Sequence, residues 1–74
     1  MPLYVKPFFH NRLKVSGYVL QDEDDTVLNI KGEAVDTNAA YSKEQPLWFF
    51  LHKQAAFNAR IEVCRVFRRK GIDI

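Results

Sequence analysis

The sequence predicts a mainly β domain: a small antiparallel barrel or rolled sheet of four or five strands around a hairpin at residues 12–36. The stretches on either side of Asp22–Asp25 alternate apolar and polar residues, as half-buried strands do. The four acids between them are typical of a solvated hairpin tip. A length of 74 residues fits one domain, residues 1–74, and the one cysteine excludes an internal disulfide.

The two strands of the predicted hairpin, residues 12–21 and 26–36, have a well-defined register. Pairing Gln21 with Thr26 brings the apolar positions of one face opposite apolar residues or glycines. Such cross-strand pairs contribute about 0.2–1 kcal/mol each. The interior glycines Gly17 and Gly32 either mark a sharp bend or relieve crowding, and the sequence leaves both alternatives open.

The segments flanking this hairpin are shorter. Residues 3–9 read as an edge strand, or as a strand that breaks at Pro7, because Pro7 has no N–H to donate to a central ladder. His10 and Asn11 form the expected turn into the hairpin. Residues 37–45 read as a connector long enough to cross the sheet, and residues 72–74 read as a tail.

Residues 46–58 fit two structures. The run 47–51 is apolar on all sides, which disfavours a surface helix and favours a buried strand at 47–52 followed by a helical turn at 53–58. The alternative is an α+β domain, an antiparallel sheet with one helix at 46–58, because Pro46 suits the first position of a helix.

Residues 60–68 are predicted to form the last strand. Ile61, Val63 and Phe67 would share one face with Arg65, while Cys64 and Val66 would lie on the other. With the earlier segments this gives the four or five strands of a closed or rolled sheet, in which few edges stay exposed.

The composition favours association with another molecule. A chain of this size buries only about 60% of its unfolded surface, so its stability is marginal without help. Its ten aromatic residues exceed what so small a core hides easily, which predicts an aromatic interface or groove. Charge is also uneven: residues 21–45 carry seven acids and two lysines, whereas residues 46–74 carry six basic side chains and two acids. That pattern fits solvated faces or oppositely charged partners.

No sequence motif indicates catalysis, a cofactor or a metal. His10, His52 and Cys64 lack the close spacing of zinc ligands. The acids Asp22–Asp25 lack the alternation and the glycine of a calcium loop. We therefore expect a protein that is not an enzyme, with no cofactor and no metal site.

Basic and aromatic residues give the only hint of a binding site. Arginines beside aromatic strands hold single-stranded nucleic acid in small barrels, where guanidinium groups meet phosphates and rings stack on bases. The candidate binding residues are the basic Arg65, Arg68, Arg69 and Lys70 and the aromatic Trp48, Phe50 and Tyr18.

Two functional hypotheses follow. The first is a non-enzymatic interaction module that contacts other proteins or itself as a homo-oligomer. The second is a small nucleic-acid-binding β-barrel. The opening residues lack a secretory pattern and the longest apolar run, 47–51, is too short for a membrane, so we expect a soluble, cytoplasmic protein without a membrane partner.

Overall fold

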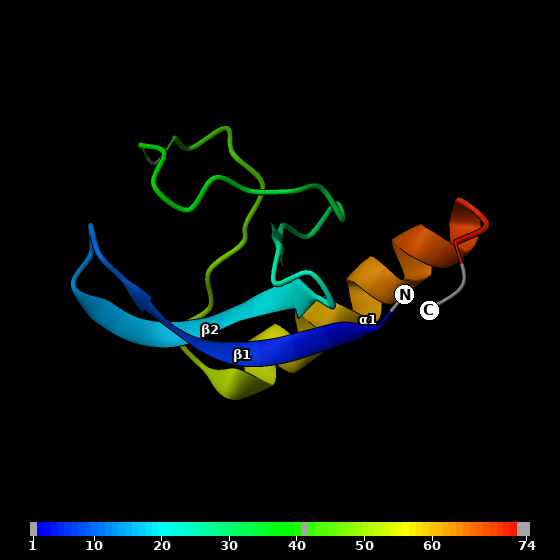
Figure 1. Cartoon of the computed structure of the whole chain (residues 1–74), viewed down its shortest axis with the longest axis horizontal. Coiled ribbons are helices and arrows are strands. Elements are labelled where there is room, and N and C mark those ends of the chain that lie inside the picture. Colours follow the sequence, from blue (N-terminus) through cyan, green and yellow to red (C-terminus); the bar gives the residue numbers. More distant parts are fainter. Residues whose placement is uncertain (1, 41, 73–74) are drawn as a thin grey trace.

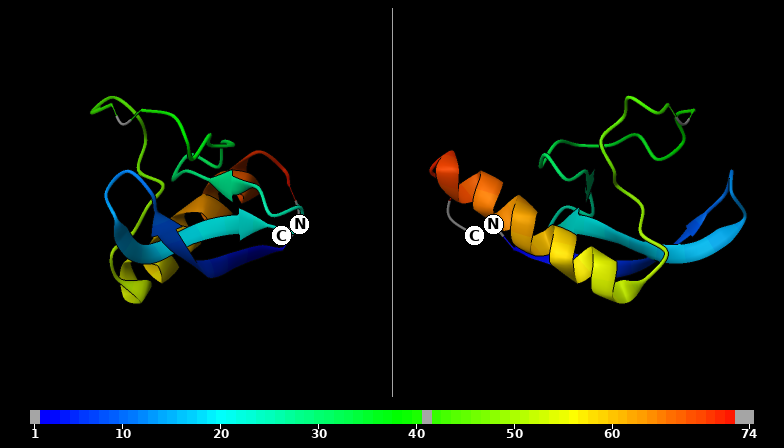
Figure 2. Two further views of the ribbon diagram at one scale, coloured as in Figure 1. Left: turned by 60° about the vertical axis from the view of Figure 1, so that its left-hand side comes forward. Right: turned by 180° about the vertical axis from the view of Figure 1, so that it is seen from behind.

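The computed structural model describes residues 2–40 and 42–72 as a three-layered α+β domain (Figure 1). The strands β1 (Leu3–His10), β2 (Val15–Asp22) and β3 (Val27–Leu28) form an antiparallel sheet in the order β1-β2-β3. The helix α1 (Lys53–Arg69) covers one face of the sheet. The irregular connector between β3 and α1 passes over the other face (Figure 2).

The central hairpin is β1–β2, and not the hairpin predicted at residues 12–36. The expected edge strand at 3–9 is confirmed, and its register runs from Leu3 opposite Asp22 to His10 opposite Val15. The turn between the strands comprises residues 11–14, and Lys14 takes a left-handed φ of 55° there. Because β1 supplies the partner for β2, residues 26–36 do not have to form a long strand.

The second half of the predicted hairpin is a turn after only two strand residues. Asn29 is buried, and its Oδ1 accepts hydrogen bonds from the N–H groups of Lys31 and Glu33 at 2.9 and 3.0 Å. Such side-chain bonds compete with a strand ladder and favour a turn. Gly32 completes this turn with a φ of +76°.

The predicted register is also wrong by one residue, because Gln21 lies opposite Val27 rather than Thr26. The carboxylate of Asp22 accepts hydrogen bonds from the N–H groups of Asp24 and Thr26, which makes the turn compact. The shift places Leu20 opposite Leu28, and both side chains join the helix-side core.

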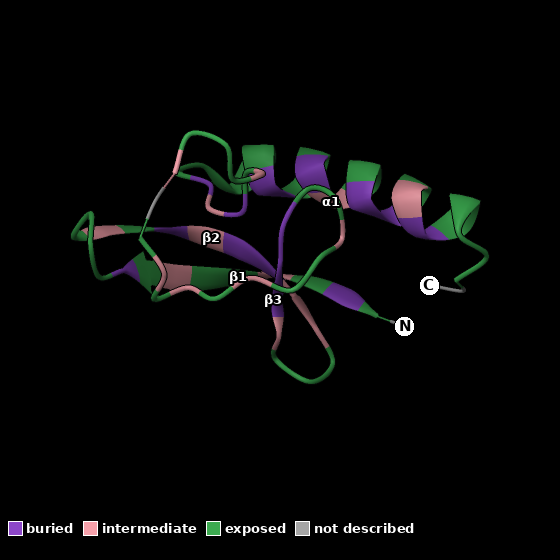
Figure 3. Ribbon diagram, turned by 90° about the horizontal axis from the view of Figure 1, so that it is seen from above, coloured by how far each residue is buried: buried purple, intermediate pink, exposed green. Residues whose placement is uncertain are grey.

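The predicted strand at 60–68 is wrong, because these residues lie within α1. The helix of the alternative prediction exists, but it spans 53–69 instead of 46–58, so only the helical turn at 53–58 belongs to it. Figure 3 shows its buried residues as a stripe along one side. They recur at helical spacing: Ala56, Ala59, Val63, Cys64 and Phe67.

Gly71 ends this helix. It has a φ of +77° and donates its N–H to the carbonyl of Arg68, while Ile72 donates to the carbonyl of Phe67 at 2.9 Å. This pair of bonds is the Schellman motif, for which glycine is the favoured residue. Of the predicted tail at 72–74, residues 73 and 74 lie outside the described residues.

The strand predicted at 47–52 is wrong, because these residues form only one isolated β-bridge, at Phe50. Phe50 and Tyr18 exchange both backbone hydrogen bonds, at 2.7 and 2.9 Å, on the edge of β2 not used by β1. In the described residues the sheet has three strands and does not close, so a barrel of four or five strands is not confirmed. The expected antiparallel sheet and the α+β class of the alternative prediction are confirmed.

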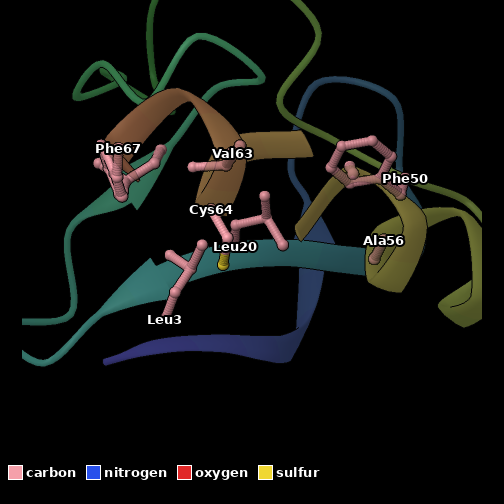
Figure 4. Packing of buried hydrophobic residues seen from close by; sticks show 9 residues of the cluster. Leu3, Leu20, Phe50, Ala56, Val63, Cys64 and Phe67 are labelled. Atoms are coloured by element: carbon pink, nitrogen blue, oxygen red, sulfur yellow. The ribbon is translucent and has the colours of Figure 1, made fainter. Parts of the chain in front are cut away.

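Alternate residues of the hairpin enter two separate cores. On the helix side, Leu3 and Leu20 pack with Phe50 and with the buried stripe of α1 (Figure 4). On the connector side, Val19 and Val27 pack with Trp48, and Phe8 and Phe49 lie against them. Both faces of the sheet are therefore covered over its central part.

Candidate interaction surface

The turn end of the β1–β2 hairpin extends past the beginning of α1 (Figure 2). Near the free end of the hairpin, Leu3 and Leu20 are buried against the helix. Near the turn, Pro7 and Phe9 stand on the same side of β1 as Leu3, but they are exposed. We call the surface of residues 7–9 and 16–18, together with Leu51, the distal hairpin face.

A hollow of about 440 Å³ lies on the distal hairpin face. Phe9 is 50% exposed and Leu51 is 58% exposed at its border, a high exposure for large apolar side chains. None of the residues that line it carries a formal charge: they are Pro7, Phe8, Phe9, Ser16, Gly17, Tyr18 and Leu51. Contiguous exposed apolar surface of this kind marks contact sites in soluble proteins.

A close crossing of two chain segments forms the floor of this region. A Cβ atom placed on Gly17 would lie 2.4 Å from the carbonyl oxygen of Phe50 and 2.5 Å from the ring of Phe49. Gly17 therefore relieves crowding, one of the two alternatives left open by the sequence. Its missing side chain lets residues 48–50 pass from the connector side of the sheet to the helix side.

A second hollow, of about 400 Å³, lies on the connector side, and we call it the His10 pocket. Leu51 borders both hollows. The wall of the His10 pocket is mostly apolar, and two of its residues have polar side chains, His10 and Gln45. The complete lining is His10, Leu13, Gln45, Pro46, Leu47, Trp48, Phe49 and Leu51.

Aromatic rings hold the imidazole of His10 at the wall of this pocket. The ring of Trp48 stacks on it, with centroids 5.2 Å apart and planes inclined by 21°. The ring of Phe49 meets it edge-on at 5.0 Å. His10 is only 6% exposed, and its Nδ1 accepts a hydrogen bond of 3.2 Å from the N–H of Leu13. The imidazole is therefore oriented both by stacking and by the hairpin turn.

The outer edge of β1 is poorly suited to pairing with another strand. Tyr18 directs its N–H and C=O toward Phe50, so the opposite residue Pro7 directs its own backbone groups to the open edge. Pro7 has no N–H to offer there, and the outward carbonyl of Leu3 accepts a 2.7 Å hydrogen bond from Nε of Arg60. Such features protect an edge from strand addition.

The basic and aromatic candidates lie apart in the structure. Arg65, Arg68, Arg69 and Lys70 are exposed in the last turns of α1 and at its C-cap, and Arg65 pairs with Glu62 at 2.8 Å. The rings of Trp48 and Phe50 are buried in different cores, on opposite faces of the sheet.

Tyr18, the remaining candidate, is half-buried against the helix-side core and lines the hollow of the distal hairpin face. It alone among the predicted residues belongs to that surface. Phe9, Leu13, Leu51 and His10 were missed. Phe9 could have been found by pairing residues 3–10 with 15–22. This register places Phe9 near the hairpin turn, at the end that the helix does not cover.

No cluster of three or more His, Cys, Asp or Glu side chains that could hold a metal ion occurs among the described residues. Within residues 2–40 and 42–72, no helix is long and apolar enough to cross a bilayer. Neither a protein-family model, nor a curated protein, nor a solved structure matches the chain.

Proposed function

We propose that this chain is a non-enzymatic interaction module that associates with a second copy of itself through the distal hairpin face. The observation that carries this proposal is the exposure of Phe9 and Leu51 beside an uncharged hollow, next to the beginning of α1. On the same side of the sheet, the helix covers the other half of the hairpin. A second copy would supply the missing cover.

The chemistry of the surface supports a symmetric contact. In a two-fold dimer the same patch meets itself, so a charged residue near the two-fold axis would lie close to its own like charge. The lining of the hollow contains no charged residue, and its polar groups are the hydroxyls of Ser16 and Tyr18. These hydroxyls both donate and accept hydrogen bonds, which suits a self-complementary patch.

The edge of β1 supports contact through side chains rather than through strand pairing. Pro7 lacks an outward N–H and the outward carbonyl of Leu3 is occupied by Arg60. A continuous intermolecular sheet along β1 would therefore lose hydrogen bonds at both places. The side chain of Phe9, in contrast, projects from the helix-facing side of the strand and is free to pack against a partner.

Measurement of molar mass against protein concentration tests the proposal. We expect the mass in light scattering to rise from one chain toward two as concentration increases. The substitution Phe9→Lys places a charge in the contact and should shift the midpoint to at least tenfold higher concentration, equal to about 1.4 kcal/mol of association free energy.

A matched control lies on the helix. Ile61 is 50% exposed, as Phe9 is, but it lies outside both hollows. The variant Ile61→Lys should leave the association unchanged. A mass of one chain at all concentrations, or an equal loss of association in both variants, would contradict the proposal.

Nucleic-acid binding by a small barrel remains the alternative proposal, supported by the exposed cluster of Arg68, Arg69 and Lys70 at the end of α1. The burial of Trp48 and Phe50 gives it less support, because stacking on bases needs an accessible ring face. Fluorescence anisotropy with labelled single-stranded oligonucleotides at two salt concentrations tests it. Binding that weakens with salt and is lost in the triple Arg68, Arg69, Lys70→Ala variant would favour this alternative.

A cytoplasmic location also belongs to the proposal. Cys64 is a free thiol buried against the sheet, so the fold does not depend on an oxidising compartment. Subcellular fractionation of cells that express the tagged chain, with detection of the tag in each fraction, would test the location directly.

A further inference from the structure

The imidazole of His10 offers a hydrogen-bond donor to the pocket that it lines. Nδ1 of His10 accepts from the N–H of Leu13, and in the neutral ring this places the remaining proton on Nε2. No hydrogen bond joins Nε2 to a described residue, and no side-chain N or O atom of the described chain is both buried and unpartnered. His10 lines the open space of the pocket, and Nε2 is the ring nitrogen that no described residue uses.

The walls around this donor fit a small apolar group. Leu13, Leu47 and Leu51 form an aliphatic rim, and Trp48 and Phe49 form an aromatic wall. The volume of about 400 Å³ lies within the range of about 300–1,000 Å³ typical of small-molecule sites. Such sites combine a mostly apolar lining with a few fixed polar groups that orient the ligand.

The charges beside the pocket favour an anionic acceptor. Leu13 lies in the hairpin turn between Arg12 and Lys14, which carry the only formal charges in residues 11–14. Arg12 is held in place by a 2.9 Å hydrogen bond to the carbonyl oxygen of Asn38. On the connector, Lys43 and Glu44 precede Gln45 and their charges offset each other. Next to the lining in sequence, basic residues therefore outnumber acidic ones, which favours an anionic ligand.

We propose that the His10 pocket binds a small apolar molecule that carries a carboxylate. The hydrocarbon part lies between the leucine rim and the wall of Trp48 and Phe49. One carboxylate oxygen accepts the hydrogen bond from Nε2–H of His10. This binding goes beyond self-association: the two hollows share only Leu51 of their linings, and Phe9 lines the distal hairpin face alone.

The chain carries its own reporter for this test, because Trp48 is the only tryptophan and it lines the pocket. We use 4-phenylbutyrate as the probe and butylbenzene as the matched molecule without an oxygen acceptor. Titration of each into the protein should change the Trp48 fluorescence in a saturable way. The carboxylate should bind at least about tenfold more tightly, as expected for a hydrogen bond to a charged group.

Two substitutions separate the polar contact from the apolar one. His10→Phe keeps a ring against Trp48 but removes the Nε2 donor, so it should reduce the preference for 4-phenylbutyrate to about twofold or less. Leu47 is 53% exposed, so Leu47→Glu should leave the fold intact and weaken 4-phenylbutyrate at least tenfold by charge repulsion. Ile61→Glu on the outer side of α1 is the control and should leave the affinity unchanged.

Equal affinity of the two molecules for the unaltered protein would overturn the proposal. Absence of a saturable fluorescence change at millimolar 4-phenylbutyrate would overturn it as well. If His10→Phe fails to fold, the affinities of the two molecules for the unaltered protein and for Leu47→Glu still show whether the pocket prefers the carboxylate. Repeating the titration with Phe9→Lys separates the two proposals: unchanged binding there, whatever the molar mass, shows that the pocket acts independently of self-association.

Discussion

The two faces of the sheet are covered by different means. On the helix side, small and aliphatic residues of α1, among them Ala56, Ala59 and Val63, let the helix lie close to Leu3 and Leu20. On the connector side no regular element is present among the described residues, and the rings of Phe8, Trp48 and Phe49 fill the space under an irregular chain. The helix combines small side chains with the ring of Phe67, whereas the cover of the connector side consists mainly of aromatic rings.

This difference has a consequence for the location of the hollows. The helix begins only at Lys53, and the part of the hairpin beyond its first turn stays open, which leaves the distal hairpin face. An irregular connector follows the sheet further but packs less evenly, which leaves the His10 pocket beside its aromatic rings. Both hollows meet at Leu51, the residue at which the chain leaves the connector and approaches α1.

Removal of one phenylalanine from each face should give the largest effect. Phe67 is 4% exposed in the helix-side core, and its ring lies against Gly32. We expect Phe67→Ala to lower the free energy of unfolding by about 3–5 kcal/mol, as is usual for a fully buried ring. Phe49→Ala should cost less, because Phe49 is only half-buried at the edge of the connector-side core.

Urea denaturation of both variants, followed by circular dichroism, measures this difference. A larger loss for Phe49→Ala than for Phe67→Ala would show that the connector side, and not the helix side, dominates the stability of the domain.

The sequence predicted the strands of the hairpin better than their partners. Period-two alternation at 15–20 correctly indicates a strand, and Pro7 correctly indicates an edge. Alternation does not identify the strand that pairs with β2, so the sequence makes residues 26–36 a plausible partner. In the structure, the side-chain hydrogen bonds of Asn29 form a turn that ends the pairing after two residues. Strand pairing depends on contacts between distant residues, which a local pattern does not contain.

The helix was missed because its residues carry two patterns at once. Ile61, Val63 and Val66 are β-branched and alternate with polar residues, which favours a strand. The positions of Ala56, Ala59, Val63 and Phe67 have helical spacing, and Gly71 is a helix stop signal. Burial against the sheet favours the helical pattern, which continues the predicted helical turn at 53–58 to Arg69.

The crossing at Gly17, where the two covers meet, should give the next largest effect. A Cβ there would lie 2.4 Å from a backbone oxygen, which cannot rotate away as a side chain can. We expect Gly17→Ala to lower the free energy of unfolding by about 1–3 kcal/mol, the usual cost of overpacking. Ser16→Ala, at the neighbouring exposed position, should change it by less than about 0.5 kcal/mol.

Hydrogen exchange adds a local measurement to this comparison. The amides of Tyr18 and Phe50 bond each other's carbonyls, so Gly17→Ala should speed their exchange more than that of Lys14, whose N–H bonds the carbonyl of His10. Equal protection in the variant and the parent protein would mean that the crossing can relax without breaking the bridge.

The smallest effect is expected at the N-cap of α1, where a substitution should stabilise the protein. His52 is the N-cap of α1, with an extended backbone (φ −118°, ψ 138°) but no side-chain hydrogen bond to the first turn, which also contains no acidic residue. An aspartate at this position accepts a hydrogen bond from a free N–H of the first turn and favours the positive end of the helix dipole. His52→Asp should therefore raise the free energy of unfolding by about 0.5–2 kcal/mol. His52→Ala should lack this gain, which separates the effect of the cap from simple loss of the imidazole.

The cap acts on α1 alone, so the gain in the free energy of unfolding should be equal in the Phe49→Ala variant and in the parent protein. A gain found in only one of these two proteins would show that the helix and the connector are coupled through Leu51.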